Sequence, residues 1–408
     1  MLNFQIPELF VNYFDNKMRI TPVNIAVTRV VLGTYFLWKG LSIDAAALTE
    51  WPVVRNDFYM YLYPPEPFGS IVVVERYVLV LSSIAFLVGY RTKVAAFLMA
   101  LTMTHLAGLK MLYLFTIGET QQMVIASLLV MLFGLYAEQD RISVDEYRRI
   151  RRDSISDPSA IEGPYPMTAL KWSLVTMGVL YFSAVWGRLV GGSLLEWLAP
   201  GSLSRWTLIF QEYFNRELFV GQWLIQSDLM LLASTVTTTI VEVGFLIAIL
   251  AGMSLTPFFV VLLGFHAIVA IATGIFFFDA FFFLMLFFAY DRMLGFIWSS
   301  ESSHVIYNPT ATLAVTIATL AAHLDDNQEH DFTAVSDTKI AHDGGLAARI
   351  DGQTVEGFDA VQRLFSSIPY LVPVGWLLTL PVVSTVGRIC FDRVSQIDSP
   401  GNSAENQL

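Results

Sequence analysis

Two neighbouring apolar runs decide the fold class of this chain. Residues 69–116 read GSIVVVERYVLVLSSIAFLVGYRTKVAAFLMALTMTHLAGLKMLYLFT, with Arg91 and Lys93 between the runs. Each run has about 20 residues, the length that an α-helix needs to cross the hydrocarbon core of a bilayer. Because no water satisfies backbone polar groups there, such a run is expected to be helical. The stretch therefore predicts a pair of membrane-spanning helices.

Runs of the same kind recur through the first three quarters of the chain. They lie at 22–43, 69–90, 93–116, 120–137, 167–190, 229–251, 254–274 and 276–298. Hydrophobic residues make up 55% of the 408 and charged residues only 14%, whereas soluble domains are roughly 25% charged. The sequence predicts an all-α polytopic bundle over residues 1–300 with about eight transmembrane helices, and it argues against a soluble enzyme.

Basic residues orient the predicted bundle. The loop at 138–166 contains Arg141, Arg148, Arg149, Arg151 and Arg152. Loops rich in Lys and Arg stay in the cytoplasm. Counting spans from this loop places both termini in the cytoplasm, in a multi-pass protein of the plasma membrane. The aromatic-rich segments 44–68 and 191–228 are then expected on the outer side, as interfacial or re-entrant helices.

Ionisable side chains inside the spans are the candidate functional residues. A charge at mid-bilayer costs about 2.5–3.5 kcal/mol on insertion scales, so each one needs a partner or a water-filled cavity. We expect an internal polar cluster formed by Arg29, His105, Glu242 and His266. These side chains either hold helices together through hydrogen bonds or form a ligand or proton site.

Other polar residues are expected to have simpler roles. Glu75, Arg76 and Lys110 lie nearer to span ends and are expected to reach the headgroups, where Lys110 is a candidate for binding an anion. No local ligand spacing predicts a metal site. The single cysteine, Cys390, excludes disulfides and CxxC chemistry within the chain and is expected to be a packing residue. The net charge of −11 argues against nucleic-acid binding, which needs a basic face.

The membrane part, about residues 15–300, resembles the HTTM family. The matching stretches are TRVVLG with Arg29, VGYRTKVAAFLMALTMTHL, YFSAVWGRL followed by an interfacial Trp197, and GFHAIVAIATGIF with His266. These proteins are bacterial and archaeal relatives of the membrane region of vitamin K-dependent γ-glutamyl carboxylase. The carboxylases use a lysine after the Tyr-Phe pair, where this chain has Gly187 and Arg188. Since arginine keeps its proton, the resemblance implies anion binding by Arg188 and disfavours carboxylation.

Residues 303–396 resemble the DCC family of thioredoxin-like thiol-disulfide oxidoreductases. That family has YDGxCxxC after its first strand, whereas HVIY is followed here by NPTATLA, so Ala311 and Ala314 stand at the cysteine positions. The stretch ARIDGQTVEGFDAVQRLF predicts a hairpin around its Asp-Gly pair and then an amphipathic helix. The resemblance implies a small cytoplasmic α/β domain over 301–408, with a disordered tail and without thiol-disulfide exchange.

The last apolar run, at 370–391, has two interpretations. It contains two prolines, Gly375 and Gly387, and leads into Arg388. We favour a helix packed on the soluble domain or lying on the membrane surface. The alternative is a ninth span, which would place the C-terminus outside.

Together these features predict a non-catalytic or accessory membrane protein. Its bundle is expected to hold a lipid, quinone-like or peptide ligand, and 301–396 to dock a cytoplasmic protein partner. The alternative is a membrane oxidoreductase or peptide-modifying enzyme of the carboxylase-like superfamily, with the four residues of the internal polar cluster as catalytic candidates. A transporter ranks last, because we find no inverted repeat with matching broken helices.

Overall fold

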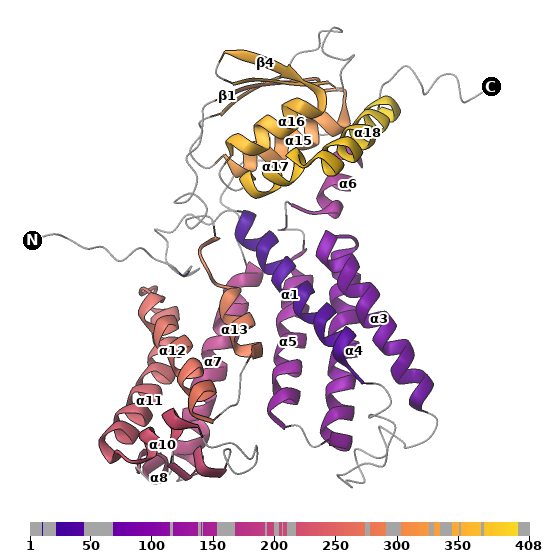
Figure 1. Ribbon diagram of the computed structural model, residues 1–408. Coiled ribbons are helices and arrows are strands. Elements are labelled where there is room, and N and C mark those ends of the chain that lie inside the picture. Colours follow the sequence, from indigo (N-terminus) through magenta and orange to yellow (C-terminus); the bar gives the residue numbers. More distant parts are fainter. Residues whose placement is uncertain are drawn as a thin grey trace, which may run out of the picture. The chain divides into compact units, whose positions relative to one another are not determined.

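The chain forms two compact units in a computed structural model (Figure 1). The structure describes residues 10, 22–44, 68–114, 117–137, 140, 142–152, 168–191, 194–199, 204–205, 207–209, 218–273, 278–290, 303–325, 330–334, 345–350, 352–368 and 371–398. The helical unit comprises Met1–Arg19, Thr28–Ala137 and Met167–Ala289, and the α/β unit comprises Ile20–Val27, Glu138–Pro166 and Tyr290–Leu408. The expected aromatic-rich segment at 44–68 lies almost wholly outside the described residues.

Helices form where the sequence has its apolar runs. The helical unit contains α1 (Pro22–Ser42, whose first turns belong to the α/β unit), α3 (Phe68–Val88), α4 (Thr92–Leu114), α5 (Ile117–Leu135), α7 (Thr168–Val190), α8 (Leu194–Leu198), α10 (Phe219–Ile225), α11 (Asp228–Leu250), α12 (Thr256–Thr273) and α13 (Phe278–Met285). The short helices α8 and α10 lie in the segment where interfacial helices were predicted, and they expose Leu195 and Phe219.

Four helices are long and apolar enough to cross a membrane in the part of the chain that the structure describes. These stretches are Ile71–Val88, Thr92–Lys110, Thr168–Val190 and Asp228–Leu250. The prediction of about eight spans is therefore wrong in its count. Two cations, Arg29 and Lys39, interrupt the apolar run of α1, the apolar parts of α5 and α12 are shorter, and α13 has only 8 residues.

The outer surface of these helices is apolar. On α3, Val74, Tyr77 and Leu81 are 61–65% exposed, whereas Ser82 and Ser83 are buried and donate to the carbonyl of Leu79. This arrangement is the inverse of a water-soluble helix, which turns its polar side outward. Since hydrocarbon solvates such a surface at no cost, the exposed residues support a membrane environment for the helical unit.

Close packing inside the helical unit depends on small residues. A Cβ atom added to Gly134 of α5 would lie 2.5 Å from the Cβ of Ala96 in α4, and one added to Gly33 of α1 would lie 2.7 Å from Leu87 in α3. Small residues allow helix backbones to approach closely, which is a main source of association energy between helices in lipid. Because Gly134 has no side chain, α4 and α5 can pack closely at this point.

We expect Gly134→Leu to lower the thermal stability of the purified protein, because its side chain would force α4 and α5 apart. Overpacking of this kind costs about 1–3 kcal/mol. Thermal unfolding in detergent measures the effect. The matched control is Gly187→Leu on α7, where an added Cβ meets no atom within 4 Å. Equal melting temperatures for the two variants would contradict the assigned packing.

The α/β unit contains a four-stranded mixed sheet covered by helices. Its elements are α6 (Val144–Arg152), β1 (Ser303–Tyr307), α15 (Thr312–Leu324), β2 (His330–Ala334), β3 (Leu346–Ile350), β4 (Gln353–Glu356), α16 (Gly357–Ser367), α17 (Val372–Thr379) and α18 (Pro381–Asp398). The strand order is β2-β1-β3-β4, with β1 parallel to β2 and antiparallel to β3. Figure 1 shows α15, α16 and α17 on one face of the sheet.

The predicted hairpin is confirmed. Ile350 of β3 pairs with Gln353 of β4, which leaves a two-residue turn between the strands. Gly352 in this turn has φ +76°, a backbone conformation that tight hairpin turns require and that glycine adopts without strain. The amphipathic helix predicted after the hairpin is α16.

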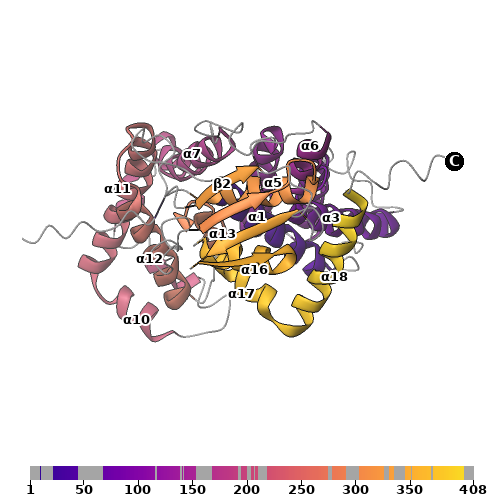
Figure 2. The same cartoon turned by 90° about the horizontal axis from the view of Figure 1, so that it is seen from above.

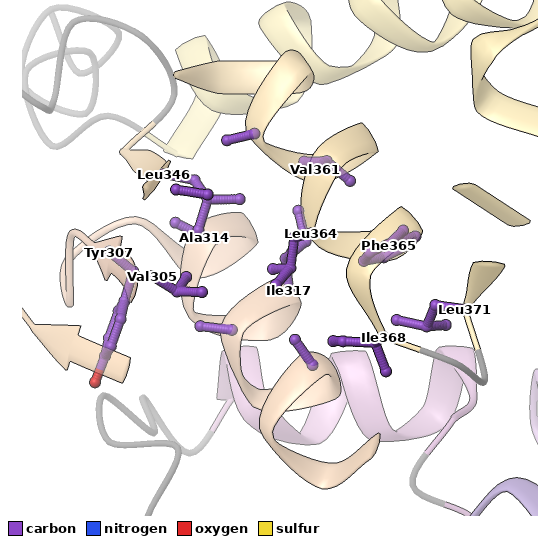
Figure 3. Packing of buried hydrophobic residues seen from close by; sticks show 14 of the residues in the cluster. Val305, Tyr307, Ala314, Ile317, Leu346, Val361, Leu364, Phe365, Ile368 and Leu371 are labelled. Carbon is purple, nitrogen blue, oxygen red and sulfur yellow. The ribbon is translucent and has the colours of Figure 1, made fainter. Parts of the chain in front are cut away.

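One core connects the sheet to its helices (Figure 3). Val305 and Tyr307 of β1 belong to the same buried cluster as Ala314 and Ile317 of α15. Residues of α16 complete this cluster. The α16 contributors include Val361, Leu364, Phe365 and, just beyond its end, Ile368, which are spaced three and four residues apart. This spacing aligns apolar side chains on one helix face.

The run at 370–391 is a pair of helices joined at Leu380–Pro381. Phe391 of α18 packs on Phe358 of α16, with ring centroids 6.2 Å apart, and the Gln362 amide donates to the Leu378 carbonyl of α17. Neither helix is among the candidate spans, and packing on the α/β unit was the favoured prediction. The expected packing role of Cys390 is wrong: helix phase leaves it exposed and buries Phe391 instead.

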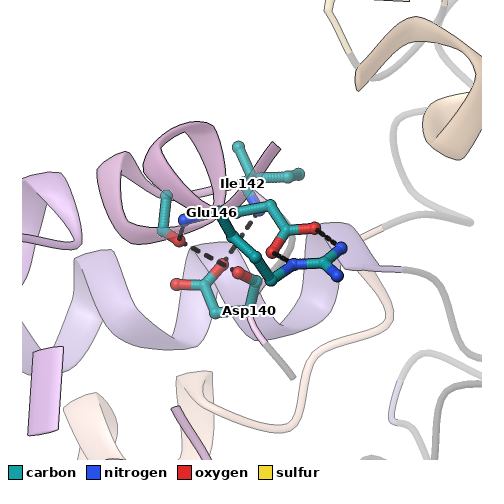
Figure 4. A network of polar contacts seen from close by, with 5 residues as sticks. Asp140, Ile142 and Glu146 are labelled. Carbon is teal, nitrogen blue, oxygen red and sulfur yellow. Dashed lines mark hydrogen bonds and ion pairs between the residues drawn. The ribbon is translucent and has the colours of Figure 1, made fainter. Parts of the chain in front are cut away.

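The arginine-rich loop contains the amphipathic helix α6, fixed at its start by side-chain hydrogen bonds (Figure 4). The Ser143 hydroxyl accepts from the backbone N–H of Glu146 at 3.1 Å, and Asp140 Oδ1 accepts from the N–H of Ile142 at 3.1 Å. Such caps satisfy N–H groups that have no partner within the helix. Arg149 then pairs with Glu146 at 2.6 Å, so the helix begins at a defined residue although its sequence is highly charged.

Candidate functional site

A charged pair links α7 to α11 inside the helical unit. Arg188 Nη1 donates to Glu242 Oε2 at 2.8 Å. The Glu242 side chain is 8% exposed and that of Arg188 is 23% exposed. Both residues lie in candidate membrane spans, where each charge lowers the cost of burying the other. The pair thus joins two sequence-predicted site residues that were expected to act separately.

An aromatic ring covers the guanidinium of Arg188. The central carbon of the guanidinium lies 4.0 Å from the ring centroid of Trp197 on α8, within the range of a cation–π interaction. The Trp197 Nε1 atom is buried and has no hydrogen-bond partner among the described residues. The predicted interfacial tryptophan therefore belongs to the same site as the arginine.

A second polar contact links α7 to α12. The Tyr181 hydroxyl lies 3.1 Å from His266 Nε2. Tyr181 and Arg188 are seven residues apart, which is about two helical turns and places them on one face of α7. We call Tyr181, Arg188, Glu242 and His266 the α7 cluster; Figure 1 shows the helices that carry it, α7, α11 and α12, side by side.

The threonines beside Glu242 form hydrogen bonds within their own helix. Thr235 and Thr238 are buried on the face of α11 that also carries Glu242. Their hydroxyls donate to the carbonyls of Leu231 and Ser234, at 3.0 and 2.8 Å. Such bonds satisfy a polar side chain within one helix and leave the interhelical contacts to the ionisable residues.

The remaining candidates from the sequence lie elsewhere in the helical unit. His105 of α4 contacts Glu75 of α3, with Nδ1 and Oε2 2.8 Å apart, so the structure pairs it outside the α7 cluster. Arg29 is 5% exposed on α1 and so points inward as expected. Lys110 is half-buried near the end of α4.

Glu75 and Arg76, which were expected to reach the headgroups, each have a protein partner. The Arg76 guanidinium donates to the carbonyls of Gly40 and Leu41 at 3.0 and 2.8 Å. These carbonyls belong to the last turn of α1 and have no partner within that helix. The arginine therefore caps α1 from the neighbouring helix.

Sequence reasoning missed a deeply buried ion pair and one member of the α7 cluster. Lys39 of α1 and Asp279 of α13 lie 3.2 Å apart, with side chains only 6% and 8% exposed. The pair could have been suspected from the sequence, because two opposite charges lie within apolar runs and each charge must be neutralised in lipid. Tyr181 lies in the YFSAVWGRL stretch. An uncharged tyrosine in an apolar run does not by itself indicate a polar partner.

Ala311 and Ala314, which the sequence resemblance aligned with cysteines, flank the start of α15. Ala311 is the residue before the helix, and Ala314 is fully buried in the core of the α/β unit. A Cβ atom added to Gly345 would lie 3.0 Å from the Cβ of Ala311. The start of this helix is therefore a close-packed corner lined by methyl groups, and these positions supply no nucleophile.

The α7 cluster offers two kinds of chemistry. A partly exposed guanidinium binds carboxylates and phosphates, and a tyrosine hydroxyl in contact with an imidazole can relay a proton. Among the described residues no three His, Cys, Asp or Glu side chains gather as metal ligands. No protein-family model, no curated protein and no solved structure matches the chain, so the cluster is interpreted from its own geometry.

Proposed function

We propose that this chain is an accessory, ligand-binding protein of the plasma membrane, whose α7 cluster holds the anionic group of a lipid-like or peptide ligand. The Arg188–Glu242 pair under Trp197 carries the proposal. In this proposal both termini lie in the cytoplasm, and neither lysine-dependent carboxylation nor thiol-disulfide exchange takes place.

Comparison with the Lys39–Asp279 ion pair supports ligand binding at the α7 cluster over a role in holding helices together. Lys39 and Asp279 are both almost fully buried, as expected of a pair that only joins helices. The Arg188 side chain is 23% exposed, and its guanidinium lies over the Trp197 ring. A guanidinium already positioned by Glu242 and Trp197 is pre-organised for a further carboxylate or phosphate oxygen, because little side-chain entropy remains to be lost on binding.

The α/β unit is proposed to dock a cytoplasmic protein through residues 301–396. The strand–helix start at β1 and α15, the hairpin of β3 and β4, and α16 support the likeness to a thioredoxin-like domain. Alanine at both cysteine positions removes redox chemistry and leaves the scaffold intact. A scaffold kept without its nucleophiles is best suited to binding.

A membrane oxidoreductase or peptide-modifying enzyme is the second candidate, and one observation favours it. Tyr181 of α7 and His266 of α12 form a hydrogen-bonded couple, and α7 also carries Arg188, which pairs with Glu242 of α11. In an enzyme this couple would move a proton while Arg188 holds the substrate. The alternative predicts that a bound molecule is recovered chemically changed from the parent protein but unchanged from His266→Ala.

Arg188→Gln is expected to release an anionic ligand that co-purifies with the parent protein. Charge-assisted hydrogen bonds contribute about 1.5–3 kcal/mol, so affinity should fall by roughly tenfold or more. Native mass spectrometry of protein extracted in mild detergent measures the bound mass, and its fragmentation distinguishes lipid, quinone and peptide.

Two further variants complete this test. Lys93→Gln removes an exposed cation at the start of α4 and should leave the bound mass unchanged, and Arg188→Lys should retain part of it. Equal ligand occupancy in the parent and in Arg188→Gln would rule out the proposed role of the α7 cluster.

A further inference from the structure

Helices α17 and α18 carry apolar residues both toward the core and at the surface. Their inner side fills the core of the α/β unit through Leu371 before α17 and Phe391. Their outer side exposes seven large apolar residues, at 37–76%: Val374, Trp376, Leu377, Leu380, Val382, Val386 and Ile389. We call these seven residues the outer stripe. A helix of a water-soluble domain normally turns a polar side outward, so this surface needs an occupant.

The exposed apolar residues lie on both sides of the break between the helices in the sequence. Val382, Val386 and Ile389 follow the spacing of one face of α18, and Leu380 lies at the junction with α17. Figure 2 shows α17 and α18 projecting past the edge of the sheet. The stripe therefore lies on a protruding part of the unit, where a broad surface can reach it.

The polar groups beside the stripe are already satisfied within their own helices. The hydroxyl of Thr379 donates to the carbonyl of Trp376 at 2.7 Å, and that of Thr385 donates to the carbonyl of Pro381 at 2.8 Å. A protein partner typically forms about one hydrogen bond per 100–200 Å² of interface. Hydrocarbon instead requires polar groups to be satisfied internally, and the exposed stripe meets that requirement.

Charge near the stripe also suits a lipid surface. Arg388 and Arg393 are exposed on α18, with Arg388 paired to Asp359 at 2.8 Å and Asp392 exposed beside Arg393. The same unit contains α6 with its four arginines, on the side of the helices away from the sheet (Figure 1). Arg388 and Arg393 lie on the same helix as part of the outer stripe, and arginines beside exposed apolar residues are typical of helices that lie in a headgroup layer containing anionic lipids.

We propose that the outer stripe of α17 and α18 lies in the interfacial layer of the bilayer and anchors the α/β unit to the lipid surface. The same chain carries helices that can cross that bilayer, so the unit is tethered to it and the local lipid concentration is high. Trp376 is suited to the headgroup level, where tryptophan is enriched. This inference is independent of ligand binding at the α7 cluster.

Cys390 provides a probe in the native chain, because it is the only cysteine and is exposed one turn after Val386. The full-length protein is labelled there with the fluorophore NBD. It is then reconstituted as single copies in nanodiscs of equal parts phosphatidylcholine and phosphatidylglycerol. We expect doxyl-lipids to quench the label several-fold more than they quench a label at Thr354→Cys in a Cys390→Ser background, which lies on the exposed strand β4.

Three outcomes would overturn the proposal. The first is rapid reduction of the Cys390 label by aqueous dithionite with little lipid quenching, which means an exposed stripe. The second is protection from both reagents, which means that protein covers the stripe. The third is lipid quenching only at more than one copy per nanodisc, which means contact with a second chain. Val382→Asp/Val386→Asp, at exposed positions, should abolish lipid quenching without unfolding the protein.

Discussion

Asp279→Ala is expected to destabilise the helical unit by about 3–5 kcal/mol, because it leaves a buried ammonium group without its counter-charge. Lys39 Nζ lies 3.2 Å from Asp279 Oδ1, and both side chains are almost fully buried. The Trp38 ring, 4.8 Å from Nζ, compensates only part of the lost attraction. Thermal unfolding in detergent should show a large fall in melting temperature.

The control for this prediction removes both charges together. Lys39→Met/Asp279→Leu keeps the volume apolar and leaves no buried charge, so stability should return toward that of the parent. If the single and double variants melt at the same temperature, the pair does not neutralise a buried charge. Asp279→Asn, which keeps the shape of the side chain, should lie between the two.

Leu364→Ala is expected to destabilise the α/β unit by about 2–5 kcal/mol, because it opens a cavity in a closely packed core. Leu364 of α16 is fully buried, and its side chain faces α15 (Figure 3). Hydrogen exchange followed by mass spectrometry should show faster exchange of the amides of β1, β3 and α15. The amides of α3 and α4 should be unaffected, because those helices belong to the other unit.

A matched variant separates cavity formation from loss of helix propensity. Leu377→Ala makes the same substitution on α17, where the leucine is 47% exposed. Its effect on exchange in the strands should be small, since little packing is lost. Comparable exchange in the two variants would show that Leu364 does not belong to the core of the unit.

The positions of the helices could be predicted from the sequence, since each depends on local properties of the chain. The run at 167–190 became α7 at Thr168–Val190, and the run at 229–251 became α11 at Asp228–Leu250. The same holds for the hairpin, whose Asp-Gly turn specifies its own geometry. The number of spans was overestimated because α13 and the apolar parts of α5 and α12 are short and two cations interrupt α1, and apolar composition alone does not mark these limits.

The partners of the polar residues were decided only by the tertiary structure. Glu242 and His266 were chosen correctly as inward-facing residues, yet their contacts, Arg188 and Tyr181, lie 54 and 85 residues away in the sequence. Lys39 and Asp279 are separated by 240 residues. A charge in an apolar run implies that a partner exists, but which one it meets depends on the rotation and packing of whole helices.

The sequence by itself thus determined where this chain is helical and apolar, because backbone hydrogen bonding and side-chain hydrophobicity act over a few neighbouring residues. The tertiary structure alone decided that Arg188 lies beneath Trp197 against Glu242, and that the outer stripe of α17 and α18 is left uncovered. Both features arise from the way helices pack on one another, and a rotation of about 100° about a helix axis exchanges a buried residue such as Phe391 for an exposed neighbour such as Cys390.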